Sequence, residues 1–307
     1  MKKISLILII SLLLSLLLPF LAAAEEGSLP LLSDLDQCEK LIYGSSNNTK
    51  PVVERIDDLE RAVYGGIFPL SIPERIAQIK SLLTEDRVDK TSLFFQLKAN
   101  EWVTKKKVSY GPLLPRLQEL EKLLIGTNAQ NSIVERMNSL TAICFKDGVV
   151  PAAEVTVNPE TLVVVEFLNR IGSKISKEGD PVEFAAAEDV IVDNVLLIPT
   201  GSKAFGTVTK AKKAGAFGKD GRLEMDFKTI HGFDGTELPL CLGEKAVEEN
   251  KRVAAAAGAS FAGVVLLGPV GLVGGAFIKG KNIVIEEGSK TYLETLEAVP
   301  MIGLSLN

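Results

Sequence analysis

Few residues of this sequence have the types and spacing that catalysis requires. His231 is the single histidine among 307 residues, which excludes most histidine-based triads and metal sites. The chain also lacks a nucleophile elbow, a phosphate-binding glycine loop and a metal-ligand spacing. A pair of carboxylates is the remaining catalytic hypothesis, with Asp180, Asp189 and Asp226 as candidates. These acids fall at expected turns or on alternating strand faces, so the sequence favours a non-enzymatic protein without cofactor, metal or evident small-molecule ligand.

Five cations gather on one predicted hairpin around Gly215 and Gly218, namely Lys210, Lys212, Lys213, Lys219 and Arg222. Cations in such a cluster can contact anionic lipid headgroups or a cell-wall polymer. The simpler interpretation is a solvated hairpin whose lysines prevent edge-to-edge strand pairing. Both interpretations stay open at the level of sequence.

A long apolar segment is the most unusual feature of the chain. Residues 253–278 carry no charge over 26 positions and lie between Arg252 and Lys279. One helix of that length would extend about 39 Å and could cross a bilayer. A crossing, however, would separate the last strands from the sheet predicted below. The sequence therefore predicts a helical hairpin that turns near Gly268-Pro269.

Small residues give this segment a surface for close contact. Gly271 and Gly275 form a GxxxG motif, which lets helices approach one another in lipid. So long an exposed apolar stretch is rare in soluble monomers. We therefore expect membrane contact or self-association through Gly258, Gly263, Gly271 and Gly275. The alternative is a buried apolar hairpin that closes one end of the β domain.

The three cysteines do not indicate a disulfide framework, because their number is odd. Cys38 and Cys144 occupy apolar positions in the first and last of the helical repeats described below. A bond between them would join the two ends of the array in an oxidising compartment. The favoured interpretation is that both are small buried apolar residues.

The N-terminus predicts export. Two lysines precede an uncharged apolar run, and Ala22-Ala23-Ala24 gives a small-residue cleavage pattern before Glu25. An uncleaved anchor is the alternative. Cleavage would leave 283 residues (307 minus 24) with a net charge of −7 (32 basic minus 39 acidic). That acidic balance argues against nucleic acid as a partner. We expect a location in the periplasm or cell envelope.

Residues 34–148 contain a helical repeat with a period near 20, after a linker over 25–33. Its copies begin with the apolar residues Leu35, Ile56, Ile76, Leu97, Leu117 and Met137. Each copy predicts a short amphipathic helix, and even spacing of this kind indicates a repeat architecture. Gly44, Gly65 and Gly126 are expected to end helices, while Ser71 and Ser132 begin capping boxes. The pairs Glu60/Arg61 and Glu121/Lys122 are expected on solvated faces.

The copy that begins at Ile56 shows an arginine, a Leu-Glu pair and an aromatic-Gly stop, in Arg55-Ile56, Leu59-Glu60 and Tyr64-Gly65, and other copies show parts of this pattern. The pattern resembles helical repeats of exported proteins from diderm bacteria. Stacked helices of this kind imply a protein-binding surface, with a spacer or oligomerisation stalk as an equal alternative.

Residues 149–307 predict a β domain. The apolar period changes to two, and turn signals such as Pro199-Thr200-Gly201 and Asp234-Gly235 separate nine short strand patterns. Many short strands with even turn spacing favour a barrel or sandwich. The expected fold is therefore α+β and multidomain: an array of short helices, then an all-β barrel or sandwich with a Gly/Ala-rich helical hairpin inserted at about 244–281.

The segment Ile198–Val208 and the later run Ile283–Ser289 carry a second resemblance. With the long insertion between them, they resemble a widespread exported β domain and, more distantly, the periplasmic β-barrel of the scaffold subunit in conjugative (type IV) secretion systems. That likeness implies a structural or adaptor role in the cell envelope, with an envelope protein, a membrane surface or a second copy as partner. Membership in an envelope-spanning secretion or transport assembly is the alternative role.

Overall fold

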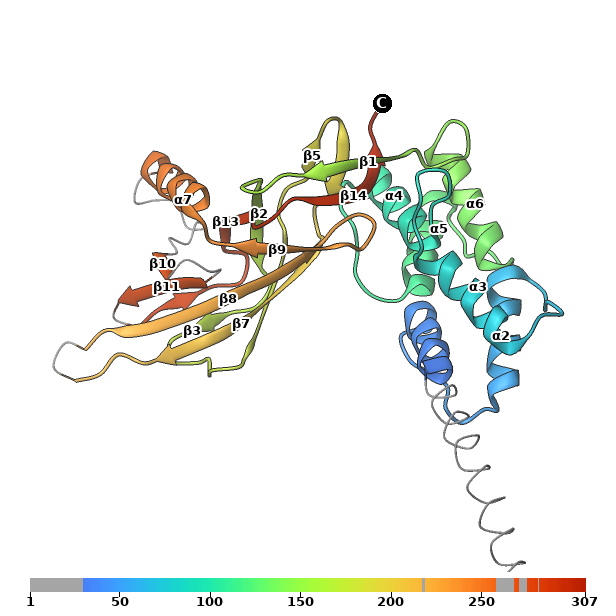
Figure 1. The fold of residues 1–307 in the computed structure, drawn as a ribbon, viewed down its shortest axis with the longest axis horizontal. Coiled ribbons are helices and arrows are strands. Elements are labelled where there is room, and N and C mark those ends of the chain that lie inside the picture. Colours follow the sequence, from blue (N-terminus) through green and yellow to red (C-terminus); the bar gives the residue numbers. More distant parts are fainter. Residues whose placement is uncertain (1–29, 217–218, 258–267, 271–274, 281) are drawn as a thin grey trace, which may run out of the picture. The chain divides into compact units, whose positions relative to one another are not determined.

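The computed structural model describes residues 30–216, 219–257, 268–270, 275–280 and 282–307 (Figure 1). Helices precede strands, as expected, and the change occurs between Cys144 and Ala152. Packing divides the chain differently. One compact unit comprises residues up to Glu85 together with Gly111–Met137, and the other comprises Asp86–Tyr110 together with Asn138–Asn307.

Short helices of nearly equal length build the first unit. They are a helix over 30–43, α2 (Val52–Tyr64), α3 (Ile72–Thr84), α5 (Leu113–Ile125) and the first part of α6 (Ile133–Cys144). Gly65 and Gly126 end their helices in the left-handed conformation, with φ of 83° and 78°. The capping box of α3 is present, since the Glu74 carboxylate accepts the Ser71 N–H at 3.0 Å. The predicted helix boundaries are confirmed.

The predicted apolar stripes form the interior. The first apolar residue of every copy is no more than 1% exposed, at Leu35, Ile56, Ile76, Leu97, Leu117 and Met137. In the copy that begins at Leu97, Asn100 stands at an apolar position and is also buried. Its amide donates to Thr141 Oγ1 at 3.0 Å, which offsets the cost of burying a polar group.

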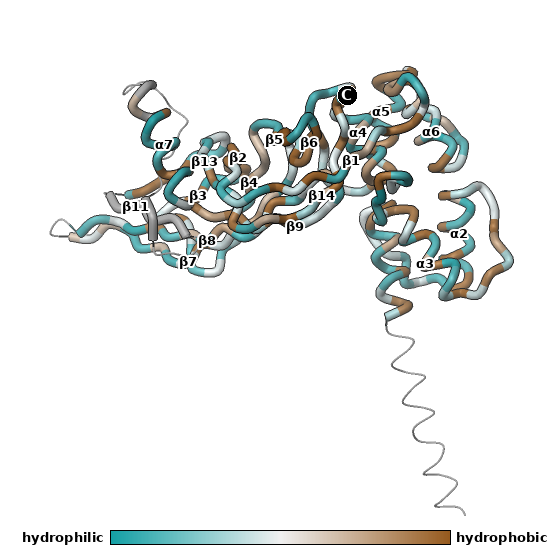
Figure 2. The backbone as a smooth tube through the Cα atoms, turned by 45° about the horizontal axis from the view of Figure 1, so that its top comes forward, coloured by the Kyte–Doolittle hydropathy of each residue, from teal (hydrophilic) through white to brown (hydrophobic). Residues whose placement is uncertain are grey.

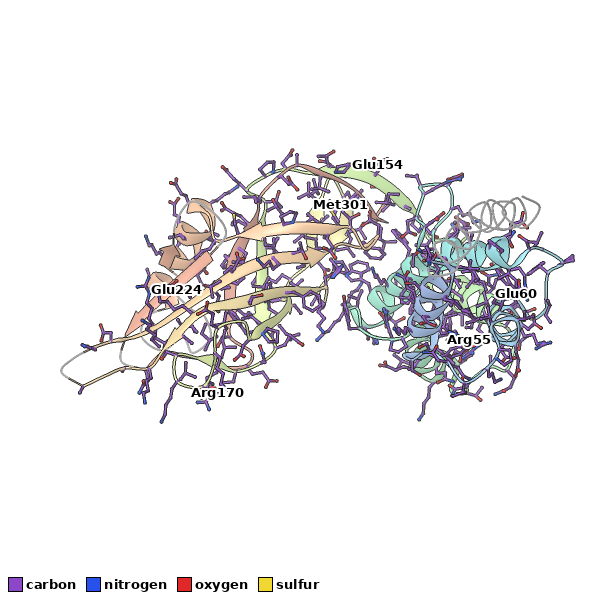
Figure 3. All side chains as sticks on the ribbon, turned by 60° about the horizontal axis from the view of Figure 1, so that its bottom comes forward. Arg55, Glu60, Glu154, Arg170, Glu224 and Met301 are labelled. Carbon is purple, nitrogen blue, oxygen red and sulfur yellow. The ribbon has the colours of Figure 1, made fainter. Side chains whose placement is uncertain are left out.

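Buried pairs of arginine and glutamate join neighbouring repeats. Arg55 donates from Nε and Nη2 to the Glu39 carboxylate at 3.0 and 2.7 Å. Arg75 Nη2 donates to Glu60 at 2.6 Å, and Arg136 contacts both oxygens of Glu121 at 2.7 and 2.8 Å. We call these three contacts the Arg–Glu pairs; Arg55 and Glu60 lie among the helices of this unit (Figure 3).

The expectation that Glu60 and Glu121 are solvated is wrong. Both are 1% exposed. Each faces an arginine of the next repeat, about 15 residues along the chain, instead of the basic residue beside it. Glu60 also accepts the backbone N–H of Phe68 at 3.2 Å, as Glu39 accepts that of Asn47 at 2.8 Å. These bonds satisfy a carboxylate that would otherwise be costly to bury.

The second unit begins with α4 (Leu93–Lys105), which packs on the strand region. The ring centroids of Phe95 and Phe233 are 4.6 Å apart. Lys98 Nζ donates to the carbonyl of Phe233 at 2.8 Å, and Trp102 Nε1 donates to Asp189 at 2.8 Å. Although α4 belongs to the helical repeats by sequence, its contacts assign it to the β unit.

Six strands close into a barrel in the order β8-β7-β4-β2-β13-β9, with β9 pairing again to β8. They are β2 (Leu162–Phe167), β4 (Pro181–Ala186), β7 (Lys203–Lys212), β8 (Gly221–His231), β9 (Glu237–Cys241) and β13 (Lys290–Thr295). Their inward residues alternate, and the rings of Phe167, Phe184 and Phe227 pack inside. The expected all-β domain is confirmed.

A second sheet and a short ribbon complete the β region. The sheet has the order β1-β14-β6-β5, and the ribbon pairs β12 with β3. These strands are β1 (Ala152–Val157), β3 (Ile171–Gly172), β5 (Val190–Val192), β6 (Val195–Ile198), β12 (Val284–Ile285) and β14 (Val299–Ser305). Met301 of β14 (labelled in Figure 3) is 1% exposed and joins the barrel core.

The insertion is only partly helical. Helix α7 (Glu244–Ala257) packs on β13, where the Glu294 carboxylate accepts the Ala246 N–H at 2.8 Å. Two strands follow, β10 (Gly268–Val270) and β11 (Gly275–Gly280), and β11 pairs with β8. The predicted second helical arm and the turn at Gly268-Pro269 are therefore wrong. The backbone groups at the edge of β8 offer partners to glycine-rich residues that form helices poorly.

Candidate interaction surface

The sheet continues beyond the closed barrel. Near its end, β8 pairs with β9 over Thr229–His231, whereas its first half, Gly221–Asp226, pairs with β11. On the other side, β4 pairs with β7 only as far as Thr207. The remaining parts of β7 and β8, over 208–212 and 221–226, form an open sheet with β11 and β10. We call this the barrel extension, and it reaches the β7–β8 turn (Figure 1).

The two faces of the β7–β8 part of the extension differ. Val208, Leu223 and Met225 are at most 1% exposed and belong to the barrel core. On the other face, Glu224 pairs with Arg222 and lies 3.9 Å from Lys210 Nζ. The alternation follows from strand geometry, in which successive side chains point to opposite faces. The strand ends next to the turn are hydrophilic (Figure 2).

The structure brings the predicted cations together and adds one. Register pairs Lys212 with Arg222, and Arg222 in turn with Lys279 of β11. We call these three residues the cation row. Lys213 and Lys219 flank the turn, and like Lys212 and Arg222 they are exposed. Lys210 lies one row further in. Lys279 was not among the predicted cations, because only the strand pairing of β11 reveals its neighbours.

The glycines predicted for close contact are described only in part. Gly258, Gly263 and Gly271 lie outside the described residues. Gly275 begins β11 and is paired in register with Asp226 and Val270. It therefore belongs to a strand, so it does not form a helical GxxxG face. Its backbone contributes to the extension.

The predicted export signal, over 1–24, also lies outside the described residues. In the described part of the chain, no helix combines the length and hydropathy needed to cross a membrane.

Cys38 and Cys144, the two cysteines considered for a disulfide, are free thiols in this structure. Cys38 is fully buried in the apolar stripe of its helix. Burial, followed by the nearby Asp34 charge, raises the pKa of the Cys38 thiol to about 11. Cys144 is half-buried, with its sulfur 3.7 Å from Thr104 Oγ1. The interpretation as a small buried side chain holds for Cys38.

The three candidate acids each have a local bonding role. Asp189 accepts the Trp102 indole and both the N–H and hydroxyl of Thr200, at 2.7 to 2.8 Å. Asp180 accepts the Lys177 N–H at 2.7 Å, and Asp226 pairs with Lys228. Within the described residues, no group of three or more His, Cys, Asp or Glu could hold a metal ion. His231 packs edge-on against Phe205, with centroids 5.8 Å apart.

A polar pocket of about 490 Å³ lies in the first unit, between the end of helix 30–43 and the start of α2. Tyr43, Asn47 and Lys50 line it, together with the pair Glu39–Arg55. The charged side chains that line the pocket form ion pairs with one another: Arg55 pairs with Glu39, and Lys50 pairs with Asp58 at 2.6 Å.

Two further features were missed at the level of sequence. The Arg–Glu pairs have a signal, since arginine precedes the first apolar residue of a copy and glutamate follows it by four. Asp86 has none. Burial raises its carboxyl pKa to about 6, although it accepts the Ser92 N–H at 2.7 Å.

No protein-family model matches the chain, and no curated protein matches it. Thirteen chains of solved structures do match. One is described as the structure of ComB10 of the Com type IV secretion system of Helicobacter pylori. It is 15% identical with a TM-score of 0.26, and the match covers 47% of this chain and 88% of that chain. This neighbour belongs to the class of secretion system named by the sequence resemblance.

Proposed function

We propose that this chain is a non-enzymatic protein of the cell envelope, exported by its N-terminal signal, that acts as a scaffold or adaptor. The barrel extension carries the proposal. An open sheet beyond a closed barrel provides a contact surface, and residues 253–278, which include β10 and the first four residues of β11, are uncharged. In this role the extension contacts a membrane or a second copy of the chain.

The first compact unit, called the helical unit from here on, supports a structural role. Its interior is closed by apolar stripes and by the Arg–Glu pairs, so its outer surface is what remains for an envelope protein partner. The three candidate acids are held by local hydrogen bonds and ion pairs, which supports the proposal that the chain is not an enzyme.

Replacement of residues 258–267 by a Gly/Ser sequence of equal length tests the contact role while leaving α7, β10 and β11 in place. We expect a folded, monomeric protein that no longer sediments with membranes or larger assemblies. A matched control replaces Thr127–Asn131, an exposed loop of the first unit, in the same way. If the 258–267 variant folds and partitions as the wild type does, these apolar residues do not make the contact, and the role proposed for the uncharged run is wrong.

Cell fractionation tests the location. Retention on membranes through a high-salt wash supports membrane contact, whereas release by osmotic shock alone contradicts it. Co-purification from the native envelope would reveal an envelope-spanning secretion or transport assembly, which is the alternative role.

A further inference from the structure

We propose that the cation row and its flanking lysines bind the phosphate groups of an anionic lipid surface. This inference rests on the membrane contact proposed above and names the chemistry of that contact. The side chains that carry it are those of Lys212, Lys213, Lys219 and Arg222, and the strand register adds the position of Lys279 beside them.

Positive charge is concentrated on the hairpin formed by β7 and β8. Residues 208–228 contain six lysines or arginines and three acids, so their net charge is +3, whereas the whole chain has −5. Concentrated positive charge on an acidic protein creates a local field that attracts anions. The overall negative charge opposes binding to a polyanion that would contact the whole molecule.

Strand register places cations of neighbouring strands opposite one another. Lys212, Arg222 and Lys279 are directly opposite one another on three adjacent strands. Like charges in opposite positions destabilise a sheet unless counter-charge is nearby. Glu224, the acid one row in, is shared by Arg222 and Lys210 and is only 15% exposed. In the described part of the chain, no acid forms an ion pair with Lys212, Lys213 or Lys219. An external anion would supply the missing counter-charge.

The neighbouring sequence identifies lipid as the anion's source. Lys279 directly follows the uncharged run 253–278, and Arg252 directly precedes it. Lysine and arginine beside an apolar stretch are typical of segments that contact the membrane interface, where each cation adds attraction to anionic headgroups. A soluble polymer would explain the cations but would leave the apolar residues beside them without a role.

Sedimentation of the purified full chain with vesicles tests the inference. The probes are vesicles of phosphatidylcholine alone and of phosphatidylcholine mixed with phosphatidylglycerol. We expect binding to the mixed vesicles that weakens as salt rises. Replacing Lys212, Lys213 and Lys219 together by Gln should weaken it roughly a hundredfold, because each cation near a membrane adds about one kcal/mol of attraction. These side chains are exposed, so the thermal midpoint should stay within a degree or two of wild type.

A control removes the same charge elsewhere. Lys40, Lys122 and Lys146 are exposed lysines outside the extension, and their replacement by Gln should leave binding within about threefold of wild type. Equal losses in both triple variants would overturn the inference, because net charge alone would then explain binding. Charge-dependent pelleting with isolated cell-wall sacculi but not with vesicles would also overturn it.

The failure of this inference can be separated from the failure of the proposed function. If the lysine variant binds mixed vesicles as wild type does while the 258–267 replacement does not, membrane contact stands and the cation row is not its determinant. If wild type binds neither kind of vesicle, both the inference and the membrane arm of the proposed function are wrong.

Discussion

The helical unit and the barrel extension use charged side chains in opposite ways. In the helical unit, Glu60 and Glu121 are 1% exposed and are bonded to arginines of the following repeat. At the end of the extension, Lys212, Lys213 and Lys219 are exposed, and Lys212 is opposite Arg222 in register. Buried pairs constrain which repeat contacts which, whereas exposed cations are available to a partner. The contrast separates charges that specify structure from charges that suit recognition.

The largest expected effect comes from breaking a buried Arg–Glu pair. In Glu60→Ala, Arg75 stays buried and loses one of its two carboxylates, since Asp57 also accepts from it at 2.5 Å. Removing one partner of a buried pair costs about 3–5 kcal/mol, and Asp57 should hold the loss near the lower figure. This loss of stability should appear as a lower denaturation midpoint of the helical unit than in the wild type, measured by chemical denaturation followed by circular dichroism. Glu54→Ala, at a residue whose side chain is 51% exposed, should change stability by less than about 0.5 kcal/mol. Similar losses for both variants would mean that the pair does not stabilise the unit.

A medium effect should follow from weakening the contact of α4 with the β region. Trp102→Phe keeps a ring but removes the 2.8 Å hydrogen bond from the indole to Asp189. Hydrogen bonds to charged groups contribute about 1.5–3 kcal/mol, and Asp189 keeps its two bonds to Thr200, so we expect a loss near the lower end. Because Trp102 is the single tryptophan, its fluorescence in the wild type reports the same contact. If that fluorescence changes with unfolding of the helical unit and not of the barrel, the assignment of α4 to the β unit is wrong.

The smallest effect concerns Asp86, a half-buried acid whose carboxylate accepts the backbone N–H of Ser92. Its pKa rises from 3.8 to about 6, chiefly by burial, so the folded state holds the proton more tightly than the unfolded state. Stability should therefore fall as pH rises from about 4 to about 6, where the folded protein binds more protons. Thermal midpoints across this range should show a shallower decline in Asp86→Asn. The exposed control Asp147→Asn should keep the wild-type slope, and an unchanged slope in the Asp86 variant would contradict the assignment.

Much of the fold could be predicted because its signals are local. The apolar residues at Leu35, Ile56 and Leu117 mark helices whose stripes are buried, and Gly65 ends its helix with positive φ. The period-two patterns of β7 and β8 likewise indicated strands. In the candidate site, the hairpin cations were found from sequence because they are close together along the chain, from Lys210 to Arg222.

Only the tertiary structure decided which distant groups meet. The partner of Glu60 is Arg75, from the next helix, and a pattern of charges along one helix could not distinguish it from Arg61. Residues 275–280 form a strand because the edge of β8 supplies hydrogen-bond partners, although the long uncharged run 253–278, which includes the first four of them, predicted a helical hairpin. That pairing placed Lys279 beside Arg222, 57 positions apart in the numbering (279 minus 222). The sequence by itself determined helix and strand periodicity, because periodicity depends on neighbouring residues. Partners were decided by packing, because burial and strand register depend on groups that are close only in the folded chain.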